Sequence, residues 1–268
     1  MASFNVLVIG DVVGRPGRKA LKELLPELKV KYKPDLTVIN GENLAHGYGV
    51  TDAILKDLQE SGVDFFTSGN HIFQNQRDLN QIFKNNPVIR PANYPDDKPG
   101  KGYKIFDVGM VKVMIVNLQG QVFFPLDEQV DNPFLTLDKI LKEEKAEKPK
   151  IIIVDFHAEA TSEKKGFGAY ADGRVSLVFG THTHVQTSDN YIMPKGTGYI
   201  SDIGMTGIKH SSLGMDFENV ISNFVHETTL PKQISTNGNC IVNGIFAKID
   251  VESGQALDIQ RIAEEVEV

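Results

Sequence analysis

Short apolar runs alternate with helix-like segments through the first third of the chain. Residues 4–9, 36–39 and 63–67 are compact apolar runs, which are typical of strands buried on both faces of a sheet. A helix is predicted over residues 16–31, where leucines recur on one face, and another over 51–61, which opens with a threonine suited to cap it. This alternation predicts parallel strands joined by helical crossovers, and therefore an α/β sandwich.

The middle and the end of the chain favour antiparallel pairing. Residues 103–108 and 111–117 flank Gly109-Met110 in the manner of a hairpin. The remaining predicted elements are a polar helix at 135–147 and strands at 150–157, 176–179, 240–251 and 258–262. The turn-rich residues 93–102 are predicted to form a surface loop. No repeat or linker interrupts the pattern, so residues 1–268 are predicted to form a single domain.

Polar groups able to bind metals follow five of the predicted strands. They are Asp11, Glu42 with Asn43, Asn70 with His71, His157, and His182 with His184. The carboxyl ends of parallel strands meet at one edge of a sheet, where ligands bind in open α/β folds. Each residue taken alone has a structural explanation, such as a helix cap, a turn or a buried hydrogen bond. Their joint occurrence at strand ends favours a metal site.

The types of side chain narrow the kind of metal. In Gly180-Thr181-His182-Thr183-His184, alternation after a strand predicts both imidazoles on one side. Imidazole with carboxylate and amide oxygens suits iron, manganese, zinc, nickel or cobalt, whereas magnesium and calcium prefer more oxygen ligands. Cys240 is the one cysteine, so a thiolate site is excluded. Two neighbouring cations need a shared carboxylate, and Glu42 is the predicted bridge.

Composition limits the partners and the compartment. The formal net charge is −7 and no run of lysine and arginine occurs, so no stable nucleic-acid complex is expected. A small phosphate ester remains compatible, because metal cations create a local positive site. A single cysteine fits a reducing compartment, and no apolar run approaches the ~20 residues that span a bilayer. The opening residues are too soon interrupted by Asp11 to form a signal peptide, so a cytoplasmic protein without a membrane partner is predicted. Whether the chain forms a homo-oligomer stays open.

The order of these motifs resembles that of the calcineurin-like metallophosphoesterases, and more closely that of their bacterial YmdB-like branch. The matching stretches are GDVVGRPGR (10–18), INGENLAHG (39–47), SGNHIF (68–73), RPANYP (90–95), DFHAEATSEK (155–164), GTHTHVQT (180–187), PKGTGYISDIGMTG (194–207) and LGMD (213–216). They cover most of the chain in the expected order. The resemblance implies a four-layer αββα sandwich of two mixed β-sheets flanked by helices.

The resemblance also implies a role for each matching position. Two metal ions are expected, with iron as the first expectation and manganese as the alternative. The implied ligands are Asp11, Glu42, Asn43 and His184 for metal one, and Glu42, Asn70, His157 and His182 for metal two. His71 matches the histidine that acts as general acid or contacts the phosphate.

Some positions depart from the family pattern or lie outside it. Val13 stands where the broader family has a histidine ligand, and Asn43 is expected to replace that ligand. Gln74 and Gln121 stand where an acid and an arginine are expected, so the substrate preference is open. Arg15, just after the first strand, and His46, in a nearby loop, are predicted to contact substrate.

The predicted function is a dinuclear metal-dependent phosphoesterase. It would hydrolyse phosphodiesters, with 2′,3′-cyclic nucleotides as the implied substrates, by attack of a metal-bridging hydroxide. His71 would protonate the leaving alkoxide, working near neutral pH where imidazole titrates. A phosphomonoesterase with the same site and a regulatory metal- or nucleotide-binding protein with little turnover are alternatives. A Rossmann-like enzyme is a further alternative, but the opening strand lacks Gly-x-Gly spacing and would not explain the histidines.

Overall fold

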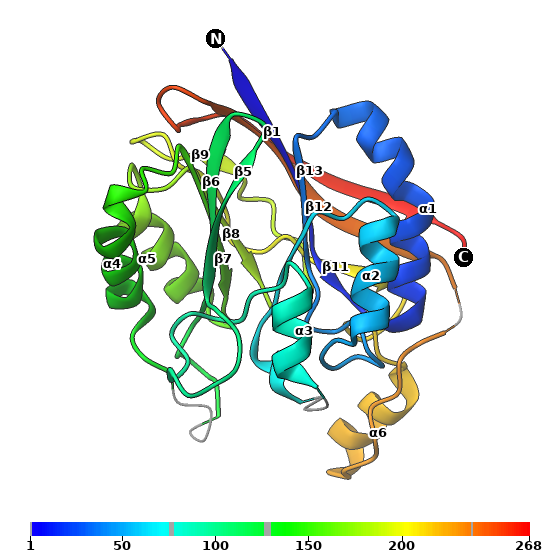
Figure 1. Cartoon of the computed structure of the whole chain (residues 1–268). Helices are drawn as coiled ribbons and strands as arrows, with labels where there is room; N and C mark the ends of the chain where they lie inside the picture. The colour runs from blue at the N-terminus through cyan, green and yellow to red at the C-terminus, as the bar shows by residue number, and fades with distance from the viewer. Residues whose placement is uncertain (1, 75–77, 126–129, 237) are drawn as a thin grey trace.

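Two β-sheets pack face to face between layers of helices in the computed structural model, which describes residues 2–74, 78–125, 130–236 and 238–268 (Figure 1). The first sheet has the order β2 (Asp11–Val12), β11 (Met205–Ile208), β12 (Cys240–Asp250), β1 (Ser3–Ile9), β3 (Leu36–Asn40) and β4 (Phe65–Thr67), with β13 (Ala256–Val266) paired to β12. The second has the order β5 (Tyr103–Val108), β6 (Val111–Gln119), β7 (Ile151–His157), β8 (Leu177–Thr181), β10 (Gly198–Ile200) and β9 (Tyr191–Ile192). Both sheets are mixed: β1, β3 and β4 are parallel, as are β6, β7 and β8, whereas β1–β12 and β5–β6 are antiparallel.

Helices cover the outer face of each sheet. The described helices are α1 (Gly14–Tyr32), α2 (Asp52–Glu60), α3 (Leu79–Asn85), α4 (Pro133–Glu143), α5 (Thr161–Ala171) and α6 (Phe217–His226), with 3₁₀ turns η1 (Asn70–Phe73) and η2 (Glu144–Ala146). Figure 1 shows α1 and α2 beside the first sheet, α4 and α5 beside the second, and α6 projecting beyond both. Within the described ranges, no helix has the length and apolar character needed to cross a membrane.

Three separate apolar clusters correspond to the three interfaces between these layers. Side chains alternate along β1, so Val6 and Val8 pack between the sheets while Leu7 and Ile9 pack in the cluster that contains the α1 leucines. The third cluster joins the second sheet to α4 and α5, and Phe156 stacks there on a phenylalanine of α5 at 4.1 Å between ring centroids. These interfaces confirm the predicted four-layer αββα arrangement.

The predicted elements were found with shifted ends. The hairpin of β5 and β6 is confirmed, and Thr51 caps α2 by accepting from the Ile54 N–H. The polar helix ends at Glu143 and continues as a 3₁₀ turn, rather than running to residue 147. Helices α3, α5 and α6 were not predicted from the sequence.

Candidate metal centre

The side chains predicted to bind metal come from both sheets. Asp11 lies on β2, Glu42 and Asn43 follow β3, and Asn70 begins η1 after β4, so these four belong to the first sheet. His157 ends β7, and the loop after β8 carries His182 and His184, all from the second sheet. The expectation of one sheet edge is therefore wrong: strand ends of two packed sheets converge.

One group of ligand atoms surrounds His157. Its Nε2 lies 3.0 Å from Nδ1 of His182 and 3.3 Å from both Oε2 of Glu42 and Oδ1 of Asn70. The candidate ligand atoms of Glu42, His157 and His182 all lie within 4.8 Å of one another. Nitrogen and oxygen lone pairs at such distances suit one shared cation.

A second group contains Asp11, Glu42 and His184, whose candidate ligand atoms also lie within 4.8 Å of one another. His184 Nδ1 donates to the backbone oxygen of Leu213 at 2.9 Å, which leaves the Nε2 lone pair 3.9 Å from Oδ1 of Asp11. Glu42 belongs to both groups, as a bridging carboxylate would.

Two buried oxygen atoms and a glycine show that this cluster fits metal ions. Oδ1 of Asp11 and Oδ1 of Asn43 have no hydrogen-bond partner within the described residues, which is costly for buried groups unless a cation binds them. A Cβ at Gly69 would lie 2.2 Å from His157 Nε2 and 2.3 Å from Glu42 Oε2. Only glycine lets the backbone approach the ligand atoms this closely.

Burial sets the protonation of the cluster. Desolvation raises the pKa of Asp11 to about 8, and the negative charge of Asp202 adds to the effect. Desolvation lowers the pKa of His182 to about 3, and that of His157 falls well below its usual value for the same reason. The imidazoles are therefore neutral at pH 7, the state that binds metal.

A buried hydrogen-bond chain orients His157. Its Nδ1 lies 2.9 Å from Thr181 Oγ1, and the Thr181 hydroxyl donates to Asp155 at 2.6 Å. Asn40 of the first sheet donates to the other Asp155 oxygen at 3.1 Å. The chain keeps Nε2 of His157 directed at the site. Asp155 was not predicted as a site residue. It lies two residues before His157 on β7, so the two side chains share one face of the strand.

A strained loop places His182 and His184, so the predicted strand-like alternation is wrong. Strand β8 ends at Thr181, and the two histidines have positive φ angles of 98° and 62°. Such backbone persists only where surrounding contacts hold it. Lys164 Nζ donates to the Thr181 carbonyl at 2.9 Å and to Asp202 at 2.6 Å.

The same Asp202 carboxylate accepts from the backbone N–H and the hydroxyl of Thr183, at 3.2 and 2.8 Å. Lys164 and Asp202 form a buried ion pair. This pair therefore fixes the residues on both sides of His182.

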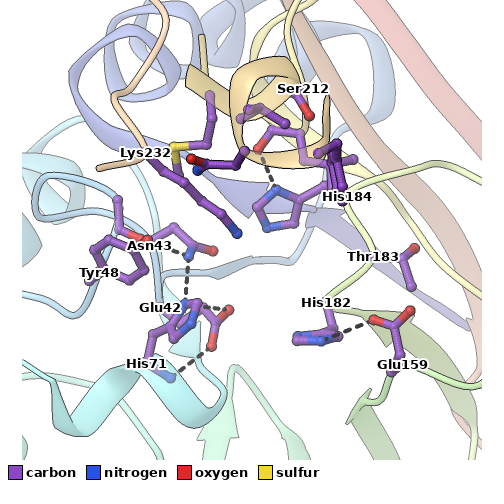
Figure 2. Close-up of a pocket in the computed structure, with 16 residues that line it drawn as sticks. Glu42, Asn43, Tyr48, His71, Glu159, His182, Thr183, His184, Ser212 and Lys232 are labelled. Carbon is purple, nitrogen blue, oxygen red and sulfur yellow. Dashed lines mark hydrogen bonds and ion pairs between the residues drawn. The ribbon is translucent and has the colours of Figure 1, made fainter. Parts of the chain in front are cut away.

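A pocket of about 570 Å³ opens above the cluster (Figure 2). His71 lines it and packs edge-on against Tyr48, with ring centroids 4.9 Å apart. Nδ1 of His71 lies 3.1 Å from the Asn43 side-chain amide, so Asn43 donates and Nε2 of His71 carries the ring proton. Glu159, which the sequence did not single out, lies 3.2 Å from Nε2 of His182.

The pocket does not include either residue predicted to contact substrate. Arg15 is exposed and is not among the residues that line the pocket. His46 is also exposed and lines a different hollow, which it shares with Gln74. Gln121 donates from its side chain to the backbone oxygen of Val130 at 2.8 Å. The predicted contacts of Arg15 and His46 with substrate stay predictions without support from this geometry.

Comparison with known proteins agrees with this fold. The chain matches the family described as YmdB-like protein over residues 7–262. It is 46% identical over 260 residues to a 2′,3′-cyclic-nucleotide 2′-phosphodiesterase of Bacillus subtilis, covering 97% of this chain and 96% of that protein.

Two crystal structures are also similar over nearly their whole length. A phosphatase from Mycoplasma pneumoniae has a TM-score of 0.93 at 35% identity, covering 99% of this chain and 94% of that one. A hypothetical protein from Thermus thermophilus has a TM-score of 0.89 at 37% identity, covering 98% and 99%. The fold is that of the calcineurin-like phosphoesterases, and within them the chain belongs to the YmdB-like family.

Proposed function

We propose that this protein is a metal-dependent phosphodiesterase whose substrates are small nucleotides, with 2′,3′-cyclic nucleotides as the preferred class. The observation that carries the proposal is the pair of ligand groups that share Glu42 beneath an open pocket. The activity named for the Bacillus subtilis relative supports the choice of substrate. Phosphomonoester hydrolysis at the same site is the second candidate, favoured by the Mycoplasma pneumoniae relative described as a phosphatase.

Two metal ions would be held by the residues that converge here. The proposed ligands are Asp11, Glu42, Asn43 and His184 for one ion, and Glu42, Asn70, His157 and His182 for the other. Imidazole with oxygen ligands suits iron, with manganese as the alternative. When bound, the ions would supply an activated water and neutralise charge on the phosphoryl oxygens. The single cysteine favours the reducing cytoplasm as the place of action.

His71 would interact with the leaving group through the hydrogen on its Nε2. The Asn43 amide donates to its Nδ1, so Nε2 holds the proton that the leaving oxygen needs. Desolvation lowers the pKa of His71 to about 4, and electrostatic repulsion, from His184 when it is protonated and from the positive charge of Lys232, acts in the same direction. The ring is therefore neutral at pH 7 in the metal-free protein. A neutral imidazole still donates a hydrogen bond from Nε2, which would stabilise the negative charge that develops on the leaving oxygen.

The test is to measure metal content and hydrolysis of a phosphodiester for the wild type and for Glu42→Gln. We expect about two transition-metal ions per wild-type chain and metal-dependent turnover. Glu42→Gln should lose metal and turnover, because it removes the only carboxylate common to both groups among the described residues. Glu23→Gln, on the exposed side of α1, is the matched control. Full metal occupancy in Glu42→Gln would reject the bridging role, and a wild type that takes up no metal would reject the function.

A further inference from the structure

The pocket above the metal centre has a second wall, built by the segment from Ser212 to Lys232. This wall carries apolar side chains from the loop after β11 and from α6. Its labelled members, Ser212 and Lys232, lie across the pocket from His71 (Figure 2). The apolar members are Leu213, Met215, Val220 and Phe224. A cavity of about 570 Å³ with an apolar wall and a few convergent polar groups is the usual form of a small-molecule site.

Lys232 brings a positive charge to this wall. Among the described residues that line the pocket, it is the only lysine or arginine. Figure 2 shows its side chain directed into the space between Asn43 and His184. Within residues 2–74, 78–125, 130–236 and 238–268, no carboxylate oxygen lies within 4.0 Å of its ammonium group. The charge is therefore available to an anionic ligand.

The backbone around Lys232 is fixed from both sides. Asn219 and Asn223 of α6 donate from their side chains to the backbone carbonyls of the two residues before Lys232, at 2.8 and 2.9 Å. The residue after it accepts from the backbone N–H of Asp216 at 2.7 Å. Anchoring a flexible side chain at its base lowers the entropy lost when it binds. These hydrogen bonds hold the backbone in the position from which the Lys232 side chain enters the pocket.

Phe224 is the aromatic member of the wall. Its side chain is 83% exposed although it lines the pocket, so the face of the ring is accessible to a ligand. A nucleobase offers a flat face that packs on an aromatic ring. The arrangement therefore suits a ligand with an anionic group near Asn43 and His184 and a planar group nearer α6.

We propose that this wall recognises the nucleotide substrate: Lys232 pairs with the phosphate, and Phe224 packs against the base. The proposal rests on the proposed function and narrows it, because it makes a nucleoside cyclic phosphate a better substrate than the same sugar phosphate without a base.

The first experiment compares Lys232→Met with wild-type protein loaded with metal. KM is measured for adenosine 2′,3′-cyclic phosphate and for ribose 2′,3′-cyclic phosphate, and the affinity for adenosine 3′-monophosphate is measured by calorimetry. Loss of a charged hydrogen-bond donor should raise both KM values and the dissociation constant about 10–100-fold. Lys232→Arg should restore most of the binding. Lys209→Met, which removes a charge outside the pocket, is the control.

The second experiment tests the base. Phe224→Ala should lose about tenfold more kcat/KM on the adenosine compound than on the ribose compound, because stacking is lost only where a base is present. Likewise, Phe224→Ala should lose about tenfold more affinity for adenosine 3′-monophosphate than for ribose 3-phosphate. Val225→Ala, the exposed neighbour on α6 that does not line the pocket, is the control.

The outcomes separate this inference from the proposed function. Wild-type affinity and KM in Lys232→Met, or equal losses on both compounds in Phe224→Ala, would overturn the inference while metal-dependent turnover stands. A wild type that binds metal and adenosine 3′-monophosphate but shows no turnover would reject the enzymatic function instead. The calorimetry would then still decide whether Lys232 and Phe224 bind the nucleotide.

Discussion

His71 differs from His157, a proposed metal ligand, in its exposure and in what its ring contacts. Its Nδ1 lies 3.1 Å from the Asn43 amide and 3.5 Å from Oε1 of Glu42, and its side chain is 24% exposed at the pocket. His157 has a fully buried side chain, with both ring nitrogens close to polar atoms of the cluster and its surroundings. His71 is therefore placed to act on the substrate, and His157 to hold a metal.

Replacing His71 should separate chemistry from metal binding. His71→Ala removes the Nε2 proton donor, so we expect turnover to fall by on the order of 10²–10⁴ while metal content is retained. The measurements are kcat on a cyclic nucleotide and elemental analysis of the same preparation. His226→Ala, at the exposed end of α6, is the control. Unchanged kcat in His71→Ala would remove His71 from the reaction.

The sequence predicted which residues meet, but not all that surrounds them. Asp11, Glu42 and His157 lie at or near the ends of buried strands, so the local pattern was enough to single them out, whereas the packing of two sheets that brings His157 to Glu42 was not predicted. Lys232 has no such signal, because it follows a helix in a segment without regular periodicity. Contacts with α6 and with Asp216 place it at the pocket. Residues placed by long-range loop contacts cannot be found from strand patterns.

Helices α5 and α6 show why whole secondary-structure elements can also be missed when only the sequence pattern is used. Helix α5 contains Gly166 and Gly168, which lower helix propensity and conceal its pattern. Gly168 is required there, because a Cβ would lie 2.4 Å from a ring carbon of Tyr199. Helix α6 carries apolar residues at helical spacing after Asp216, a good N-cap, so its signal was present in the sequence. It was missed because no element was predicted between the strands at 176–179 and 240–251.

The loop after β8, which carries His182 and His184, is held in place by a buried ion pair. Lys164 is 2% exposed and Asp202 is 1% exposed. Lys164→Met would leave the Asp202 carboxylate buried without its partner, and we expect the free energy of unfolding to fall by about 3–5 kcal/mol. Metal affinity should fall as well, because the loop loses its anchor. Chemical denaturation of metal-free protein and metal titration measure the two effects.

Two controls make that test specific. Lys164→Met/Asp202→Asn should be less destabilised than Lys164→Met alone, because no unpaired charge stays buried. Lys22→Met, in a half-exposed pair with Asp57, should cost less than about 1 kcal/mol. Equal costs for Lys164→Met and Lys22→Met would contradict a supporting role of the buried pair.

At the scale of the whole molecule, the metal centre joins the two sheets. Asn40 of the first sheet donates to Asp155 of the second, and Glu42 of the first lies against His157 of the second. A cation bound there would connect the sheets at the same point. It would also bind only the folded chain, since strand ends far apart in the sequence supply the ligands. Metal binding and folding are therefore coupled, and protons take part in that coupling.

The proton balance predicts how metal affinity depends on pH. Desolvation and the Asp202 charge raise the pKa of Asp11 to about 8, so its carboxyl is mostly protonated at pH 7 in metal-free protein. The histidines have lowered pKa values and have no proton to lose there. Binding at pH 7 should therefore release about one proton from Asp11, and affinity should rise about tenfold per pH unit up to pH 8 and then level off. Calorimetry in two buffers of different ionisation enthalpy counts the protons. Affinity that stays constant or falls between pH 6 and 8 would show that Asp11 binds no metal or is already ionised.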